Sequence, residues 1–274
     1  MIQKVNIPGA TLSVLDVGQD APILFVHGFP LDHSMWREQV ADLSRDHRCL
    51  VPDLRGFGQS TVTEGCVTME QFADDLAELL DALAITEPVV LCGLSMGGYI
   101  AWEFARRHAA RLRGLILCDT RAVPDSAEAA ANRLKLADDV VRVGPELVAN
   151  AMLPKLLSDR ESTRRTELKD DLRRVILATD PRGIAAASRG MAERADARPW
   201  LAGIGCPALV IVGEQDVIST PAEMSEIAKR LPNAIFRVIA DAGHLAPLEN
   251  PPLVNDFMRS FLATTASRSC PPRV

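Results

Sequence analysis

A serine that lies between two closely spaced glycines is the feature that most constrains how this chain can fold. The segment reads Gly93-Leu94-Ser95-Met96-Gly97 and joins the apolar run 88–92 to a helical pattern that starts at residue 98. A tight strand-to-helix turn forces its central residue into strained backbone angles and brings strand and helix into close contact, so the flanking positions need glycine. The pattern therefore predicts a nucleophile elbow, with the side chain of Ser95 projecting clear of a sheet.

Short apolar runs alternate with helical patterns along most of the chain. Strands are predicted at 23–26, 49–51, 89–92, 115–118, 208–212 and 235–239, and helices at 35–43, 69–83, 98–108 and 221–231. Two earlier segments, 4–7 and 12–16, predict an antiparallel hairpin. This α/β alternation predicts a mostly parallel, eight-stranded sheet with helices on both faces.

The alternation stops between about residues 124 and 199, where the sequence is charged and has no strand pattern. A structureless loop of this length is uncommon in a compact domain. We therefore expect a helical cap inserted at residues 123–199, with helices at 132–143, 146–157, 162–178 and 181–192. Residues 1–122 and 200–265 then form the core, and residues 266–274 are expected to be a flexible tail.

The composition is that of an ordinary globular protein. The chain has 274 residues, 24% of them charged, and a formal net charge of −6, a size that fits one large domain with an insertion. The acidic balance and the lack of a Lys/Arg block argue against a nucleic-acid partner. No apolar stretch approaches ~20 residues and no leader pattern is seen, so we expect a cytoplasmic protein without a membrane partner. The sequence leaves open whether the chain forms a homo-oligomer.

The cysteines have no spacing that indicates a metal site or a disulfide framework. No CxxC pair is present, and two of the cysteines lie inside apolar, strand-like runs. We therefore expect buried free thiols. The six are Cys49, Cys66, Cys92, Cys118, Cys206 and Cys270.

A serine hydroxyl needs a base to become a nucleophile, usually a histidine that a carboxylate orients. Of the five histidines, His244 directly follows the predicted strand 235–239, at the edge of the sheet where open α/β folds place ligands. It is the predicted base. His27 ends the first core strand and is expected to hold the following loop. The others are expected to be solvated surface residues: His33, His47 and His108.

Asp216 is the preferred carboxylate for the histidine. It lies in a loop after the predicted strand 208–212, and the chain order serine, aspartate, histidine fits this type of fold. Asp119, at the end of the run 115–118, is the rival, because a neighbouring strand end could also reach the histidine. Its alternative role is a cap bonded to backbone.

Acyl transfer also requires donors for a developing oxyanion. The backbone amide of Met96 is one candidate, since it starts a helix whose dipole favours negative charge. The second candidate is the amide of Phe29, in the loop after the strand 23–26.

With these residues placed, the chain resembles the α/β-hydrolases nearly end to end, closest to the small-ester carboxylesterase and 3-oxoadipate enol-lactonase-like branches. The resemblance rests on five segments in order: 27–32 (HGFPLD), 52–60 (PDLRGFGQS), the elbow, 213–216 (GEQD), and Gly243-His244 followed by Glu249-Asn250-Pro251. It implies that Asp53, Arg55 and Ser60 belong to a structural loop beside the site.

The resemblance implies a serine hydrolase that cleaves a small carboxylic ester or lactone through an acyl-enzyme on Ser95. His244 and Asp216 would complete the triad, and Phe29 and Met96 the oxyanion hole. Dehalogenases and epoxide hydrolases carry an aspartate at the serine position, so direct carboxylate displacement is disfavoured. Candidates for substrate contact are Trp36, Met152, Met191 and Trp200, although a Met or Trp in an apolar pattern belongs more often to the core.

Three alternatives remain open at this point. The same triad can support perhydrolase or bromoperoxidase-like activity, or hydrolysis of a carbon–carbon bond. A hydrolase-like fold can also act as a ligand-binding receptor without catalysis, although all the proposed catalytic residues are present here. The chain contains no HExxH, no phosphate-binding GxxxxGK and no GxGxxG after a strand, so neither a metal nor a nucleotide cofactor is implied.

Overall fold

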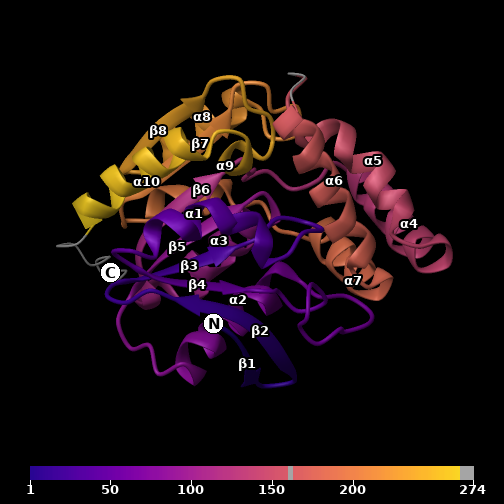
Figure 1. Cartoon of the computed structure of the whole chain (residues 1–274), viewed down its shortest axis with the longest axis horizontal. Helices are drawn as coiled ribbons and strands as arrows, with labels where there is room; N and C mark the ends of the chain where they lie inside the picture. The colour runs from indigo at the N-terminus through magenta and orange to yellow at the C-terminus, as the bar shows by residue number, and fades with distance from the viewer. Residues whose placement is uncertain (160–162, 266–274) are drawn as a thin grey trace.

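A single sheet organises the part of the chain that the computed structural model describes, residues 1–159 and 163–265. Within it, eight strands lie in the order β1-β2-β4-β3-β5-β6-β7-β8 (Figure 1). β1 pairs antiparallel with β2 and β2 antiparallel with β4, whereas all later pairs are parallel. The predicted α/β fold class and the opening hairpin are confirmed. The bounds are β1 Ile2–Ile7, β2 Ala10–Val17, β3 Pro22–Val26, β4 Arg48–Pro52, β5 Val89–Leu94, β6 Leu112–Cys118, β7 Ala208–Gly213 and β8 Ala234–Ile239.

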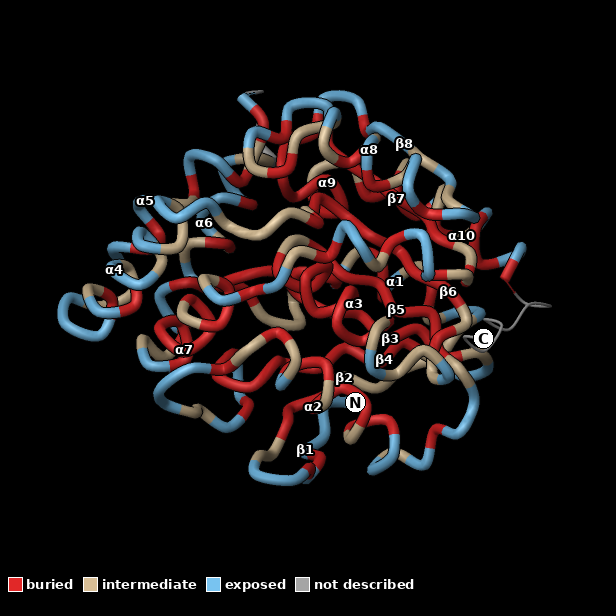
Figure 2. The backbone as a smooth tube through the Cα atoms, turned by 180° about the vertical axis from the view of Figure 1, so that it is seen from behind, coloured by how far each residue is buried: buried red, intermediate tan, exposed pale blue. Residues whose placement is uncertain are grey.

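Helices cover the central strands. Every residue of β3, β5 and β7 is buried, as a parallel sheet with both faces covered requires, and Figure 2 shows this buried centre. α1 packs with α9 and α10, and α2 packs with α3. These helices span α1 Arg37–Leu43, α2 Met69–Ala82, α3 Met96–Arg107, α8 Pro221–Arg230, α9 Ala246–Glu249 and α10 Pro251–Thr265, with 3-10 turns at His33–Trp36, Ala109–Arg111 and Arg198–Gly203.

Helix starts follow from local sequence. α8 begins with a capping box, in which the Thr220 side chain accepts from the Glu223 amide and the Glu223 carboxylate accepts from the Thr220 amide, and Pro221 occupies the first turn. The side chain of Thr68 caps α2 by accepting a hydrogen bond from the amide of Gln71. Such caps satisfy amides that a helix cannot satisfy itself.

Among the described residues, four α-helices lie between β6 and β7, and we call them the α4–α7 segment. Their bounds are α4 Ala127–Val143, α5 Glu146–Leu156, α6 Thr163–Ala178 and α7 Pro181–Ala192. They lie together on one side of the molecule (Figure 1). α4 begins five residues before its predicted start, because Ser126 caps it through the amide of Ala129. The predicted start of the third helix, Ser162, lies outside the described residues.

α7 packs against the core through glycines. A Cβ atom at Gly183 would lie 1.9 Å from the carbonyl oxygen of Gly56, and one at Gly190 would lie 1.8 Å from that of Val67. Between these two contacts, the amide of Val67 donates to the carbonyl of Ala186 (3.1 Å). Backbone therefore lies directly on backbone, and the segment is fixed closely to the loop that follows β4.

The cysteine prediction is confirmed at Cys49, Cys92 and Cys118 and wrong at Cys66. The first three are buried free thiols, whereas Cys66 is free but exposed, because it lies in the surface loop before α2. Cys206 is buried. Burial raises the pKa of the Cys49 thiol to about 12. Cys270 and the predicted tail 266–274 lie outside the described residues.

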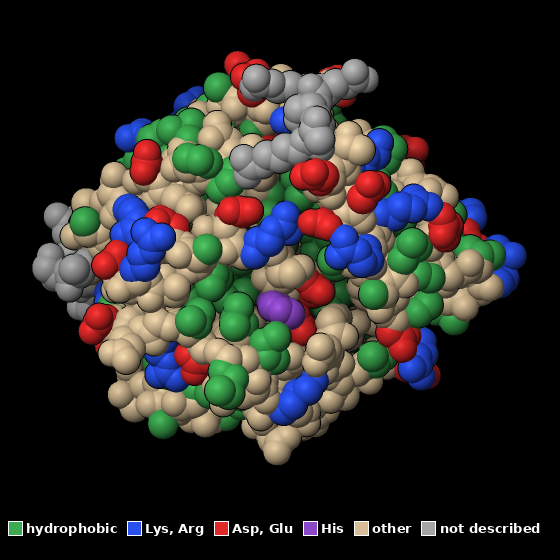
Figure 3. Space-filling model, in the orientation of Figure 1, with side chains coloured by type: hydrophobic (Ala, Val, Ile, Leu, Met, Phe, Trp, Pro, Cys, Tyr) green, Lys and Arg blue, Asp and Glu red, His purple; other side chains and the backbone are tan. Residues whose placement is uncertain are grey.

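Two surface properties bear on partners. Acidic and basic side chains are interspersed over the face shown in Figure 3. None of the helices within residues 1–159 and 163–265 has the length and apolar character needed to cross a membrane.

We expect Gly190→Ala to lower the free energy of unfolding by about 1–3 kcal/mol, the usual cost of overpacking, because the new methyl group would meet the Val67 backbone. Gly203→Ala is the matched control, since a Cβ there meets nothing within 4 Å. Urea denaturation followed by circular dichroism measures both. Equal stability of the two variants would contradict the close backbone contact.

Candidate active site

Ser95 occupies a strained turn between β5 and α3. Its backbone has φ 54° and ψ −111°, a region that residues other than glycine rarely adopt. A Cβ at Gly93 would lie 2.4 Å from the carbonyl oxygen of Gly97, and one at Gly97 would lie 2.3 Å from that of Val26. Both glycines are therefore needed for strand and helix to come this close, and the backbone has the shape that the sequence pattern predicted.

The segments that carry the two predicted oxyanion donors adjoin Ser95. Met96 is the first residue of α3, so its amide is one of those that the helix itself leaves unsatisfied. On the other side, a Cβ at Gly28 would lie only 3.5 Å from the Cβ of Ser95, which places this part of the 27–30 loop against the turn. The Phe29 side chain is buried and its ring packs edge-on against Phe57, so the ring belongs to the core.

His244 and Asp216 form a buried pair. The Nδ1 atom of His244 lies 2.8 Å from Oδ2 of Asp216, and the two side chains are only 2% and 0% exposed. The other carboxylate oxygen, Oδ1, accepts from the amides of Ile218 (2.7 Å) and Ser219 (3.0 Å). The carboxylate is thus held by three donors, and the proton on Nδ1 leaves Nε2 as the ring nitrogen that can accept another proton.

Close contact between two loops brings this pair together. A Cβ at Gly213, the last residue of β7, would lie 2.0 Å from the carbonyl oxygen of Gly243. The amide of Gln215 donates to the carbonyl of Ala242 (2.8 Å). The loop after β7 and the loop after β8 are therefore joined through their backbones, and each presents its functional side chain at the carboxyl edge of the sheet.

The rival carboxylate, Asp119, has a different environment. It is fully buried, its Oδ1 accepts from the amide of Gly213 (2.8 Å), and its Oδ2 has no hydrogen-bond partner among the described residues. Burial, and then the charge of Asp216, raise the pKa of Asp119 well above its usual value. Asp119 thus bonds to backbone, and Asp216 is the carboxylate that contacts the histidine.

His27 forms hydrogen bonds to backbone groups through both of its ring nitrogens. His27 accepts from the amide of Leu54 and donates to the carbonyl of Gly28, both at 3.0 Å. Burial lowers its pKa, which suits the predicted structural role.

The prediction of solvated surface histidines is wrong for two residues. His33 bonds Asp53 (2.6 Å), which raises the pKa of His33, and His108 bonds Asp74 (2.7 Å). His47 is half-buried, and burial lowers its pKa.

In the part of the chain that the structure describes, one group of side chains has ligand atoms close enough together to hold a metal ion. It consists of Asp32, His33 and Asp53. Their ligand atoms already bond to protein. Oδ1 of Asp53 accepts from both the amide and the ring of His33, and Oδ1 of Asp32 accepts from the amide and hydroxyl of Ser34. These bonds indicate that the group stabilises a turn.

The four candidates for substrate contact lie in different places. Trp36 and Met191 belong to the core, and Trp36 packs against Phe25 with ring centroids 5.2 Å apart. Met152 is half-buried, and Trp200 lies under the guanidinium of Arg106, 5.0 Å from its ring centroid.

A cavity of about 250 Å³ lies between α6 and the segments that carry Leu31 and Leu248. Leu172 and Val175 of α6 also line it, whereas neither Ser95 nor His244 does.

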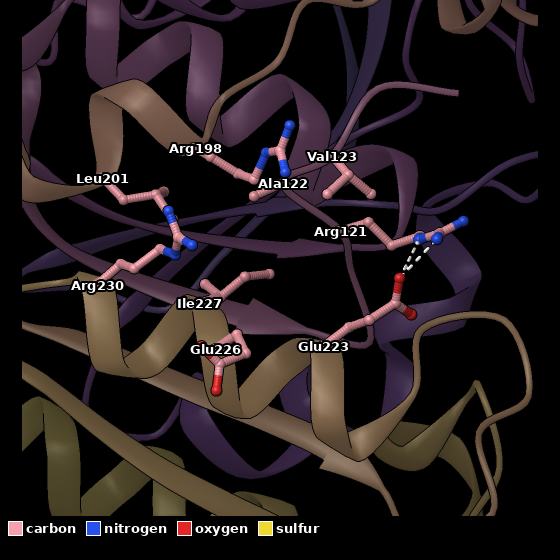
Figure 4. Close-up of a pocket in the computed structure, with 9 residues that line it drawn as sticks. All are labelled: Arg121, Ala122, Val123, Arg198, Leu201, Glu223, Glu226, Ile227 and Arg230. Carbon is pink, nitrogen blue, oxygen red and sulfur yellow. Dashed lines mark hydrogen bonds and ion pairs between the residues drawn. The ribbon is translucent and has the colours of Figure 1, made fainter. Parts of the chain in front are cut away.

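A second cavity, of about 220 Å³, lies where the α4–α7 segment leaves and rejoins the core. Figure 4 shows its lining and the ion pair between Arg121 and Glu223. Neither Ser95 nor His244 lines it.

Comparison with known proteins identifies relatives over nearly the whole chain. The family described as "alpha/beta hydrolase fold" matches residues 21–251. A thermophilic esterase from Thermogutta terrifontis, whose structure has malate bound, is 48% identical with a TM-score of 0.93, over 97% of this chain and 100% of that one. The 3-oxoadipate enol-lactonase 1 of Acinetobacter baylyi is 34% identical over 91% of this chain and 92% of its own length. The enol-lactonase from Burkholderia xenovorans LB400 is 33% identical with a TM-score of 0.88, over 95% of this chain and 100% of that one.

The raised pKa of Asp119 predicts a pH-dependent stability. The folded protein holds this proton more tightly than the unfolded chain, so the contribution of Asp119 to the free energy of unfolding is full at acidic pH. It falls as the pH rises above about 4, by up to about 1.4 kcal/mol per pH unit, until the raised pKa is passed.

Asp119→Asn cannot ionise and keeps an oxygen for the Gly213 amide, so we expect its stability to fall less than that of the wild type between pH 5 and 8. Urea denaturation at several pH values measures the difference. Parallel curves for the two proteins would show that Asp119 is already ionised in the folded state.

Proposed function

This chain belongs to the α/β-hydrolase fold family, and from that premise we propose that it is a carboxylic ester hydrolase that cleaves a small ester or lactone through an acyl-enzyme on Ser95. One observation carries the proposal: a strained serine after β5 and a buried histidine–aspartate pair after β8 and β7. Parallel strands place their carboxyl ends at the same edge of a sheet. The family relatives named as an esterase and as enol-lactonases support the same reaction class.

The chemistry proceeds in two halves. Ser95 Oγ attacks the carbonyl carbon of the substrate while its proton passes to Nε2 of His244, and Asp216 holds the opposite ring nitrogen. The oxyanion accepts hydrogen bonds from the amides of Phe29 and Met96. The tetrahedral intermediate then collapses, and the alcohol leaves with the proton from His244.

In the second half, His244 takes a proton from water as the water attacks the acyl-enzyme, and returns it to the Ser95 oxygen as that oxygen leaves. An ester has released its alcohol before this step. In a lactone, the freed hydroxyl stays joined to the acyl chain, and both leave together as one hydroxy acid. The same residues therefore serve both substrate classes, and the surrounding walls select between them.

We propose that the α4–α7 segment forms the walls around the substrate, as part of a cap that comprises residues 123–199. The cavity beside α6 has an apolar lining from Leu31, Leu172, Val175 and Leu248, with Arg37 and Arg174 also among its lining residues. Met152 on α5 and Trp200 do not line this cavity and remain candidates for substrate contact.

Ser95→Ala is expected to reduce kcat/KM for a short p-nitrophenyl ester by about 10⁴-fold or more, because the nucleophile is lost. Circular dichroism should show an unchanged fold. More than a tenth of the wild-type activity in a folded variant would rule out Ser95 as the nucleophile.

A pair of aspartate variants tests the choice of carboxylate. Asp216→Asn is expected to lower kcat by about 10⁴-fold, because the imidazole then loses its orienting charge and its correct tautomer. Asp119→Asn should stay within about tenfold of wild type, since Asp119 bonds the Gly213 amide and the contact to His244 comes from Asp216. The opposite ranking would make Asp119 the partner of the base.

A fluorophosphonate probe separates an enzyme from a ligand-binding protein. We expect one adduct per chain, located on the peptide that contains Ser95 by mass spectrometry, and none in Ser95→Ala. A folded wild type that does not react would favour the receptor-like alternative. A panel of short esters, lactones, acetate with peroxide, and a diketone then distinguishes hydrolysis of esters from perhydrolysis and from carbon–carbon bond cleavage.

A further inference from the structure

Glu249, at the end of α9, is a buried carboxylate close to the predicted base in sequence. Its side chain is 0% exposed. Oε1 accepts from the amide of Gly243 (2.6 Å), and Oε2 accepts from the amide of Ser158 (3.0 Å) and forms an ion pair with Arg165. The three donors come from the loop of His244, from the end of α5, and from α6, so one carboxylate joins the core to the α4–α7 segment.

A second layer of bonds strengthens this junction. Arg165 donates to the carbonyls of Ser158 (2.8 Å) and Asp241 (3.1 Å), and the Ser158 hydroxyl also donates to Asp241 (3.1 Å). The amide of Leu245 donates to the carbonyl of Leu156 (3.1 Å). Both chain neighbours of His244, residues 243 and 245, are therefore held by this cluster.

The contact is also close. A Cβ at Gly243 would lie 2.6 Å from the amide nitrogen of Ser158 and 2.8 Å from the carbonyl carbon of Leu157. The loop and the segment meet backbone to backbone, with no flexible side chain between them. A shift of the α5–α6 end of the segment must therefore move the loop that carries His244.

Asp216 alone does not fix the imidazole, because it holds only Nδ1. In the proposed mechanism, the direction of Nε2 depends also on the backbone at 243–245. We propose that Glu249 is a positioning residue that locks the His244 loop onto the α4–α7 segment, with Arg165 as its partner on the segment. This inference rests on the proposed function, and it gives a role to a residue outside the triad and the oxyanion hole.

The choice of a carboxylate fits this role. A buried ion pair adds little net stability compared with an apolar contact of the same size, but it fixes geometry through several directed bonds. The cavity beside α6 is lined by the same two elements, since α6 contributes Leu172 and Leu248 belongs to α9.

Glu249→Gln is the main test. It keeps the shape of the side chain but removes the charge and places an amide NH₂ against an amide donor or the guanidinium. We expect kcat to fall by about 10–100-fold, the effect of a small misplacement of a catalytic group, with KM changed less than threefold. The rate of fluorophosphonate labelling at Ser95 should fall in parallel.

Asp75→Asn is the matched control. Asp75 is another buried carboxylate in an ion pair, with Arg55 at 2.6 Å, but its bonds run to Arg55, in the loop after β4, and to Gln71 of α2. We expect a loss of stability with kcat within about twofold of wild type. A Glu249→Gln variant that loses stability but keeps wild-type kcat and labelling would show that Glu249 is structural only, and would overturn the inference.

Arg165 provides a test that does not depend on how well Glu249→Gln folds. Arg165→Ala should lower kcat, Arg165→Lys should restore part of it, and adding Arg165→Ala to Glu249→Gln should cause no further loss. Additive losses, or a full effect with lysine and alanine alike, would separate Arg165 from Glu249 and contradict the proposal. An unlabelled wild type would instead contradict the proposed function, so the two failures are distinct.

Discussion

Close contact between backbones at the elbow is the constraint on which the proposed site depends. The absence of side chains at Gly93 and Gly97 lets β5 and α3 approach to distances that no Cβ would allow, and this approach holds Ser95 at positive φ. The same device recurs at Gly213, where two loops that carry Asp216 and His244 touch. Because backbone contacts do not yield as side chains do, they place reacting groups with little freedom.

The buried acids near the site differ in how their charge is compensated. Asp216 is held by two amides and an imidazole. Asp119 has one amide, and burial, together with the charge of Asp216, raises its pKa. Glu249 is paired with Arg165 and two amides. A charge in a buried site survives only where enough donors replace water, so the donor sets assign each acid a different role.

Much of the fold was predictable because it follows from local patterns. Apolar runs and helical periodicity located the strands of the sheet and the four helices of the α4–α7 segment, and the paired glycines located the turn at Ser95. The predictions that were wrong concerned contacts between segments that are distant in the sequence. His33 and His108 were expected in solvent because the sequence does not show that Asp53 and Asp74 reach them, and Trp36 packs inside the core although its pattern also fitted a pocket.

The sequence by itself determined the order of strands and helices, the backbone shape at Ser95, and the small set of histidines and aspartates that could act with it. These depend on periodicity and on which residues tolerate a given backbone angle, and both are local properties. Only the tertiary structure decided that Asp216 rather than Asp119 contacts His244, and that Glu249 joins the His244 loop to the α4–α7 segment. Such pairings depend on the distances and the burial that folding creates between residues far apart in the chain, and no local pattern encodes them.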